Sequence, residues 1–288
     1  MHKLEQLYNE TAKRFNNDLN IIIQAFINFY GVENSEYIIN KIRNSRIIWY
    51  DDSNRDDDIQ NQIISSINGD ELTEILKKRK KEAFLQSAYI DEIDVLILPL
   101  NYDLTHIIHE INHKIGSHII SIEPLIQISG ISYSVEKNGI VEYDNDLNEA
   151  INQKMTLEIL EELNKLGLKI NITASWQEQL FPIIDTFYAT FKEQLKNLNI
   201  SGDLVAFKEK LGKEYFDKFS QLVFMCSFRA RRSISKGEEV NYSIDRINTI
   251  NDLVSNMKIH SETLSLTTRK SGARWNAPYR VDINKKIN

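Results

Sequence analysis

The residues that could do chemistry in this chain gather in one short stretch. Six histidines occur in 288 residues, and four of them, His106, His109, His113 and His118, lie within thirteen positions. His109, Glu110 and His113 spell H-E-x-x-H, which chance alone would produce about 0.01 times in a chain of this composition. On a helix, histidines four residues apart share a face and can bind one metal ion. A carboxylate between them can take a proton from a water that the metal holds.

The alternative is a polar helix face that contains histidines by coincidence. Projected onto a helix at about 100° per residue, the aliphatic side chains between 104 and 115 form one arc and His106, His109 and His113 lie opposite it. Histidines buried only to fill a core would lie on the aliphatic arc, so the pattern favours the metal site. Glu110 lies beside the histidine face, as a general base should.

A catalytic zinc ion usually takes three protein ligands, so a third has to come from elsewhere. A third histidine six residues after His113 is excluded, because that residue is Ile119. The better candidate is Glu149, in the first turn of a helix predicted from about 146 to 167. A glutamate at such a position also interacts favourably with the helix dipole, which is the alternative explanation for it.

Together these residues resemble a known family. His109-Glu110-Ile111-Asn112-His113, with Asn148-Glu149-Ala150 on a following helix, resembles the gluzincin class of zinc metallopeptidases over about residues 93–160. The resemblance implies that His109, His113 and Glu149 bind one zinc ion. It also implies that Glu110, as general base and acid, activates a zinc-bound water that hydrolyses a peptide or protein substrate, more in the manner of an endopeptidase than an exopeptidase.

The chain also departs from that family. Gluzincins often carry an acidic residue four positions after the ligand glutamate, and here that residue is Gln153, whose amide oxygen can orient a histidine but adds no charge. The gap between His113 and Glu149 is long and strands are few. These features indicate a divergent bacterial branch. The chain is more weakly similar to the small H-E-x-x-H proteases that cleave repressors in mobile genetic elements.

Other roles stay open at this point. Candidates for a second group that stabilises the oxyanion are Tyr133, Tyr188, His106 and His260. A substrate carboxylate could bind Arg229, Arg231 or Arg232, although a solvated helix end is the favoured explanation for these arginines. The strand at 95–98 could offer an edge to an extended peptide or lie inside a sheet.

A different class of function is a peptidase-like zinc-binding or protein-interaction module without turnover. A fourth protein ligand that closed the zinc site would support it, and His106 or His118 would be the candidate. Hydrolysis of a non-peptide substrate is chemically permitted, but no residue points to it.

The order of helical and strand-like segments around these residues predicts an α+β, mostly α fold, with a small β-sheet beside the histidine helix. Helices in an N-terminal region (1–90) precede a metallopeptidase core (91–170), which contains a buried strand at 93–100, the histidine helix capped by Asp103, a hairpin with Asn138-Gly139 at its turn, and the Glu149 helix. A helical region (171–264) and a loosely ordered tail (265–288) follow.

Composition limits the partners and the compartment. The net charge of −6 argues against nucleic acid as the main partner, and no apolar run approaches the ~20 residues of a membrane span. Cys226 is the only cysteine, so no disulfide forms within the chain. The N-terminus lacks the apolar core of a signal peptide, which predicts a cytoplasmic protein, with a secreted mature form left open. The oligomeric state is not indicated.

Overall fold

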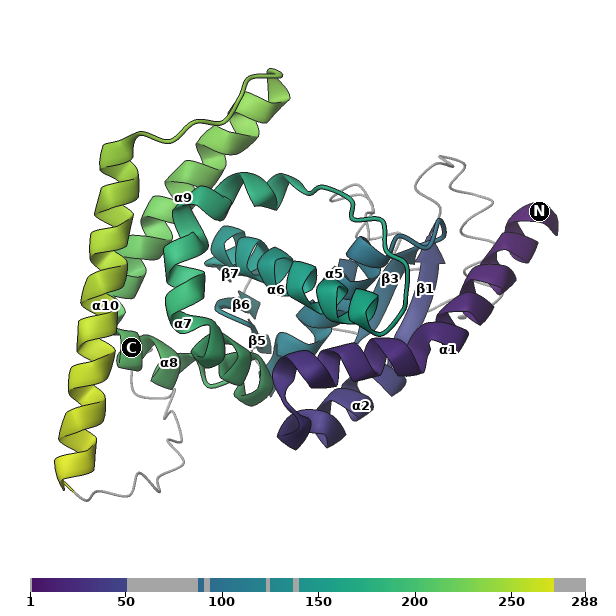
Figure 1. Cartoon of the computed structure of the whole chain (residues 1–288), viewed down its shortest axis with the longest axis horizontal. Coiled ribbons are helices and arrows are strands. Elements are labelled where there is room, and N and C mark those ends of the chain that lie inside the picture. Colours follow the sequence, from purple (N-terminus) through teal and green to yellow (C-terminus); the bar gives the residue numbers. More distant parts are fainter. Residues whose placement is uncertain (1, 51–87, 91–93, 123–124, 137–139, 272–288) are drawn as a thin grey trace.

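The fold is taken from a computed structural model, which describes residues 2–50, 88–90, 94–122, 125–136 and 140–271 (Figure 1). It is α+β and mostly α, with a helical C-terminal half, as the sequence predicted. The helices are α1 (His2–Tyr30), α2 (Ser35–Arg43), α5 (Leu104–Gly116), α6 (Asn145–Lys165), α7 (Phe181–Ser201), α8 (Leu204–Leu211), α9 (Lys213–Ser235) and α10 (Ile244–Ser271), with the short 3-10 helices η1 (Val32–Asn34) and η3 (Trp176–Leu180). The strands are β1 (Arg46–Tyr50), β2 (Ala88–Ile90), β3 (Val95–Pro99), β4 (Ser117–Ile122), β5 (Leu125–Ser129), β6 (Ser132–Glu136) and β7 (Ile140–Tyr143).

The first sheet has the order β1-β3-β2, with β3 parallel to β1 and antiparallel to β2. All five residues of β3 are buried, which confirms the buried strand predicted before the histidine helix. The suggestion that this strand offers a free edge to a peptide is wrong, because both of its edges are paired. The edge strand of this sheet that contacts α5 is β2.

The N-terminal region is not purely helical, because β1 and β2 both lie in it. Their short apolar runs were not predicted, since periodicity alone cannot distinguish a buried strand from a piece of helix over so few residues. The helical stretches predicted around Gly69 lie outside the described residues.

The second sheet is an antiparallel meander in the order β4-β5-β6-β7, so the described residues form two sheets where one small sheet was expected. The predicted hairpin is present as β6 and β7, and its turn at 137–139 lies outside the described residues. The sequence predicts residues 127–135 as the first strand of that hairpin, but a turn at Gly130, which has a φ of +56°, divides them between β5 and β6. The strand β4 follows α5 directly and was not predicted.

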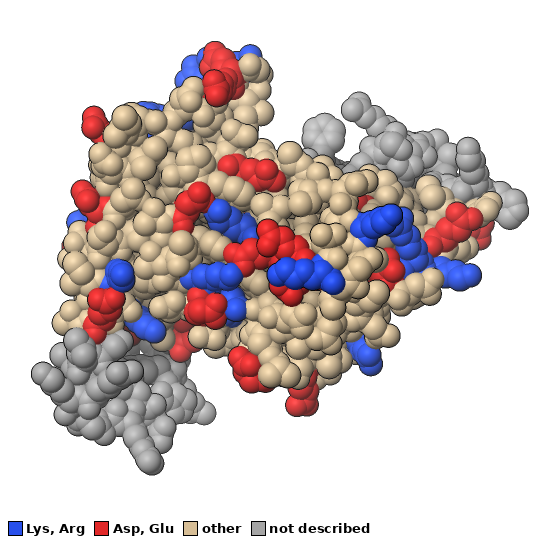
Figure 2. Space-filling model, in the orientation of Figure 1, with Lys and Arg blue, Asp and Glu red and all other residues tan. Residues whose placement is uncertain are grey.

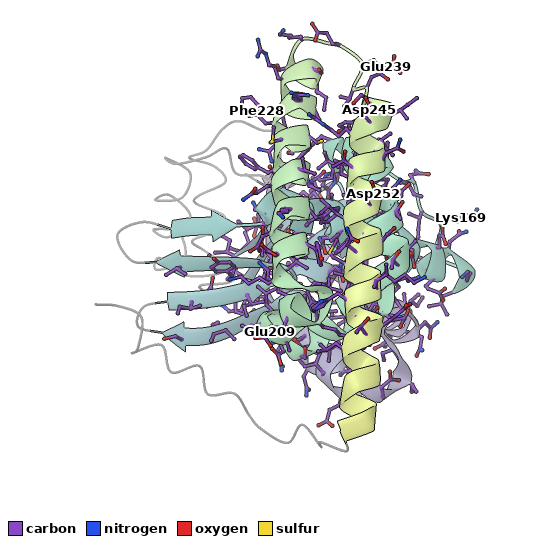
Figure 3. The ribbon with its side chains drawn as sticks, turned by 90° about the vertical axis from the view of Figure 1, so that its left-hand side faces the viewer. Lys169, Glu209, Phe228, Glu239, Asp245 and Asp252 are labelled. Atoms are coloured by element: carbon purple, nitrogen blue, oxygen red, sulfur yellow. The ribbon has the colours of Figure 1, made fainter. Side chains whose placement is uncertain are left out.

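The helix α6 lies at the centre of the molecule, where it contacts α1, α5, α7 and α9 (Figure 1). At one end of the molecule, α9 and α10 run side by side, and Phe228 lies exposed on α9 (Figure 3). A single cluster of buried side chains includes residues from Tyr8 in α1 to Met257 in α10. The predicted region boundaries stay predictions. The last helix ends at Ser271, beyond the predicted start of the tail at 265.

The face seen in Figure 2 carries acidic and basic side chains close together. Ion pairs also join neighbouring helices: Lys192 of α7 pairs with Glu158 of α6, and Lys154 of α6 pairs with Asp185 of α7. Among the described helices, none combines the length and apolar character needed to cross a membrane.

Candidate metal centre

The helix α5 is oriented by its two ends and its apolar arc. Asp103 caps it as predicted, because its side chain accepts a hydrogen bond from the backbone N–H of Thr105 at 2.9 Å. The helix ends at Gly116, where the chain continues as β4. The four isoleucines of the aliphatic arc are completely buried: Ile107, Ile108, Ile111 and Ile115. Their burial turns the opposite face toward α6.

The three predicted ligands come together between α5 and α6. The Nε2 atoms of His109 and His113 lie 3.1 Å apart, and each lies 3.2 Å from an oxygen of Glu149, Oε2 for His109 and Oε1 for His113. Tetrahedral zinc with bonds of about 2.0–2.1 Å would separate its ligand atoms by about 3.4 Å. The arrangement therefore fits a zinc ion after shifts of a few tenths of an ångström.

The charge state of the group also suits a cation. Burial raises the pKa of the Glu149 carboxyl, but the nearby His113 and His109 outweigh burial and hold that pKa well below its usual range. Glu149 is therefore ionised at neutral pH. Its side chain is 23% exposed, against 10% for His109 and 12% for His113, so solvent reaches the centre from the Glu149 side.

Glu110 lies beside the centre without joining the ligand group. It is buried, and its Oε2 accepts a hydrogen bond from the backbone N–H of Tyr89 in β2 at 2.8 Å. Burial raises the pKa of Glu110, and the charges of His109 and His113 oppose that rise. The edge strand β2 thus fixes the orientation of the predicted base, which the sequence did not reveal.

The ring of His109 is oriented from α6. Its Nδ1 lies 3.0 Å from Oε1 of Gln153, the contact that the sequence suggested for this amide. The amide nitrogen of Gln153 donates in turn to Glu178 of η3 at 3.1 Å. The backbone oxygen of His109 accepts a hydrogen bond from Asn152 at 3.0 Å. The contact of Nδ1 with Gln153 orients the ring so that Nε2 is directed at the other two ligands, and the bond from Asn152 joins the backbone of α5 to α6.

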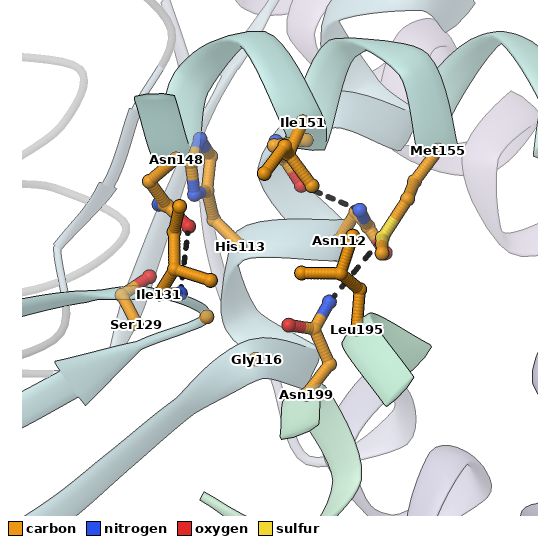
Figure 4. Close-up of a pocket in the computed structure, with 12 residues that line it drawn as sticks. Asn112, His113, Gly116, Ser129, Ile131, Asn148, Ile151, Met155, Leu195 and Asn199 are labelled. Atoms are coloured by element: carbon orange, nitrogen blue, oxygen red, sulfur yellow. Dashed lines mark hydrogen bonds between the residues drawn. The ribbon is translucent and has the colours of Figure 1, made fainter. Parts of the chain in front are cut away.

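Behind His113 lies a buried network of amides (Figure 4). Asn112, the fourth residue of the H-E-x-x-H motif, accepts from the hydroxyl of Tyr30 and donates to Asn152, both at 2.5 Å. Asn199 of α7 donates to Tyr30 at 2.8 Å. The network therefore ties α1, α5, α6 and α7 together directly behind the ligands.

A small cavity adjoins this network, with His113, Gly116, Asn148 and Asn199 among its lining residues (Figure 4). At about 10 Å³ it has room for one water molecule at most, so it is no substrate pocket.

The remaining histidine candidates lie elsewhere. Nε2 of His118 lies 2.8 Å from the backbone oxygen of Asn199, so this residue joins β4 to α7. Nδ1 of His106, on the exposed part of α5, lies 3.0 Å from Asp103. His260 lies on α10 against the ring of Tyr215. Within the described part of the chain, no fourth histidine, cysteine, aspartate or glutamate joins the ligand group.

The two tyrosines suggested as oxyanion-stabilising groups pack against other side chains away from the ligands. Tyr188 packs near Lys154, which lies about 140° around α6 from Glu149, so Tyr188 contacts a different face of that helix. Tyr133 lies on β6 under the ammonium of Lys208.

Of the three arginines suggested for a substrate carboxylate, Arg229 and Arg232 are exposed on α9, and Arg231 has a carboxylate partner within the chain. Arg231 pairs with Asp146 in the first turn of α6 and lies 4.4 Å above the ring of Trp176 in η3. It fastens α9 and η3 to the helix that carries Glu149.

No protein-family model matches the chain, and comparisons with curated proteins and with solved structures likewise gave no match. The interpretation of the centre consequently depends on its geometry.

Proposed function

We propose that this chain is a zinc-dependent metallopeptidase that binds the metal through His109, His113 and Glu149. The observation that supports it most strongly is the convergence of three ligand residues, whose nitrogen and oxygen atoms lie 3.1–3.2 Å apart, with a second carboxylate, that of Glu110, held beside them. A purely structural zinc site is normally closed by four protein ligands. The described residues supply three, which leaves a position for a reacting molecule.

When bound, the zinc ion would act as a Lewis acid and lower the pKa of water to about 7. The chain's own contribution is the placement of Glu110. The bond from the backbone N–H of Tyr89 to Oε2 holds the carboxylate in one orientation beside the ligands. Its Oε1 makes no such bond to the described residues, and it is the oxygen to which we assign the proton transfer. In the proposed reaction, Oε1 takes the proton of the water that attacks the peptide carbonyl and passes it to the leaving amine nitrogen.

The first test is zinc content per chain, measured by elemental mass spectrometry on wild type, Glu149→Ala and Glu161→Ala. Glu161 lies exposed on the same helix and controls for the loss of a carboxylate. We expect about one zinc ion in wild type and in Glu161→Ala, and much less in Glu149→Ala. Equal zinc in all three proteins would exclude Glu149 as a ligand.

The second test separates binding from catalysis. Glu110→Gln should retain zinc but lose cleavage of a peptide-library substrate that the wild type hydrolyses. Normal cleavage by Glu110→Gln would show that the assigned base is wrong. Stoichiometric zinc without cleavage of any library peptide by the wild type would favour the non-catalytic binding module instead.

A further inference from the structure

Three residues from three elements form a continuous hydrogen-bonded chain that leads away from the metal centre. Nδ1 of His109 contacts Oε1 of Gln153 at 3.0 Å, and Nε2 of Gln153 donates to Oε1 of Glu178 at 3.1 Å. A histidine ligand is commonly oriented by a carboxylate that contacts its second nitrogen. Here a neutral amide occupies that position, and the carboxylate stands one residue further out.

The carboxylate at the end of this chain is held in place by its own element. Glu178 and Ser175 form a capping box at the start of η3. In one half of this box, Oε1 of Glu178 accepts a hydrogen bond from the backbone N–H of Ser175 at 3.0 Å. Glu178 is partly shielded from solvent. Two N–H donors therefore converge on one oxygen of an acceptor that cannot itself donate while ionised.

The direction of every bond follows from that fixed acceptor. The carboxylate of Glu178 requires the NH₂ group of Gln153 to face it, so the amide oxygen must face His109. The oxygen in turn requires a proton on Nδ1 of His109, which leaves the lone pair of Nε2 directed at Glu149 and His113. A negative charge behind an amide also polarises it and strengthens the hydrogen bond that its oxygen accepts.

We propose that Glu178 is a positioning residue for the metal centre, and that its charge acts on His109 through the amide of Gln153. The proposal rests on the metal site of the proposed function. It explains how the chain still provides a negative charge behind His109, although Gln153 stands four positions after the ligand Glu149 where gluzincins often have an acidic residue. The carboxylate is supplied by η3, a separate element, and so is coupled to the placement of that element over α6.

The test is a charge exchange measured as zinc affinity, by competition with a chromophoric chelator on the full chain. Glu178→Gln is nearly isosteric, and glutamine also serves in capping boxes, so the fold should persist while the charge is lost. We expect it to weaken zinc binding about tenfold, at the lower end of the 10–100-fold range for residues that orient a ligand. Gln153→Glu would set two carboxylates about 3 Å apart and should not improve binding. The double variant Gln153→Glu, Glu178→Gln puts one carboxylate directly on His109 and should restore affinity to within about threefold of wild type or better.

A control separates charge from structure. Ser175→Ala removes the hydroxyl of the capping box but retains both bonds to the Glu178 carboxylate, so zinc affinity should change less than about twofold. Loss of affinity in Ser175→Ala equal to that in Glu178→Gln would reduce Glu178 to a structural cap and overturn the proposal. Failure of the double variant to recover affinity would also overturn it. If the wild type itself binds no zinc, the proposed function fails first.

Discussion

The buried amide network offers the sharpest test of how the site is supported. Asn112 is fully buried, and Asn112→Ala removes the acceptor of the Tyr30 hydroxyl and the donor to Asn152. Each buried polar group that loses its partner costs about 1–3 kcal/mol. Two such groups, the Tyr30 hydroxyl and the side-chain oxygen of Asn152, predict a loss of about 2–6 kcal/mol in the free energy of unfolding.

The network also predicts how two substitutions combine. Tyr30→Phe leaves the Asn112 oxygen without its donor and removes the oxygen that Asn199 contacts, so alone it should cost about 2–6 kcal/mol. The double variant removes the Tyr30 hydroxyl and the Asn112 amide together, so neither group is left buried without its hydrogen-bond partner. The double variant should therefore be more stable than the sum of the single effects indicates, by about 1–2 kcal/mol.

These values can be measured by urea unfolding in the presence of EDTA, so that metal binding does not contribute. The midpoints should shift while the dependence on urea concentration stays constant. Gln24→Ala is the control, because Gln24 is exposed on α1 and its side chain contacts Asn28 of the same helix, so this change should alter stability by less than about 0.5 kcal/mol. An Asn112→Ala variant as stable as this control would refute the reasoning, as would strict additivity with Tyr30→Phe.

Three further predictions concern the turn, the cap and the metal. Gly130→Ala should lower the free energy of unfolding by at least about 2 kcal/mol, because Gly130 has a φ of +56° and a Cβ there would lie 2.4 Å from the Asn148 side-chain oxygen. The control Gly167→Ala should cost only about 1 kcal/mol, because Gly167 has a φ of +95° but open space around it. Equal urea midpoints for the two variants would contradict this prediction. Burial alone would raise the pKa of Asp103, but hydrogen bonds from His106 and Thr173 outweigh it and lower the pKa to about 2, below the unfolded value of about 3.9. The stabilisation by Asp103 is thus complete above about pH 4 and is lost as the pH falls toward 2, so the stability difference between wild type and Asp103→Asn should shrink over that window; a constant difference would argue against it. Zinc at a thousand times its dissociation constant should add about 4.1 kcal/mol. For 288 residues this corresponds to a rise in Tm of about 7 °C over the EDTA-treated protein, which a calorimetric scan would detect and which Glu149→Ala should lack.

The sequence by itself determined the parts of the site that depend on local geometry. The spacing of His109 and His113 places both on one face of a helix, and the aliphatic arc opposite them decides which face is buried. The Asp103 cap and the buried strand β3 are equally local, because each is specified by a few adjacent residues. Glu149 was predicted from its place in a first turn together with the family resemblance, and the structure brings it to both histidines.

Only the tertiary structure decided what surrounds these ligands. Tyr89 is 21 residues from Glu110, and Glu178 is 25 residues from Gln153. Such partners meet because whole elements pack together, and no periodicity in a single segment records which elements will meet. His118 illustrates the same limit: it lies next to the histidine helix in sequence, yet the end of that helix at Gly116 turns it into β4 and toward α7. Helix periodicity depends on neighbours a few residues apart, whereas the support of a metal site depends on contacts that only the packed core brings together.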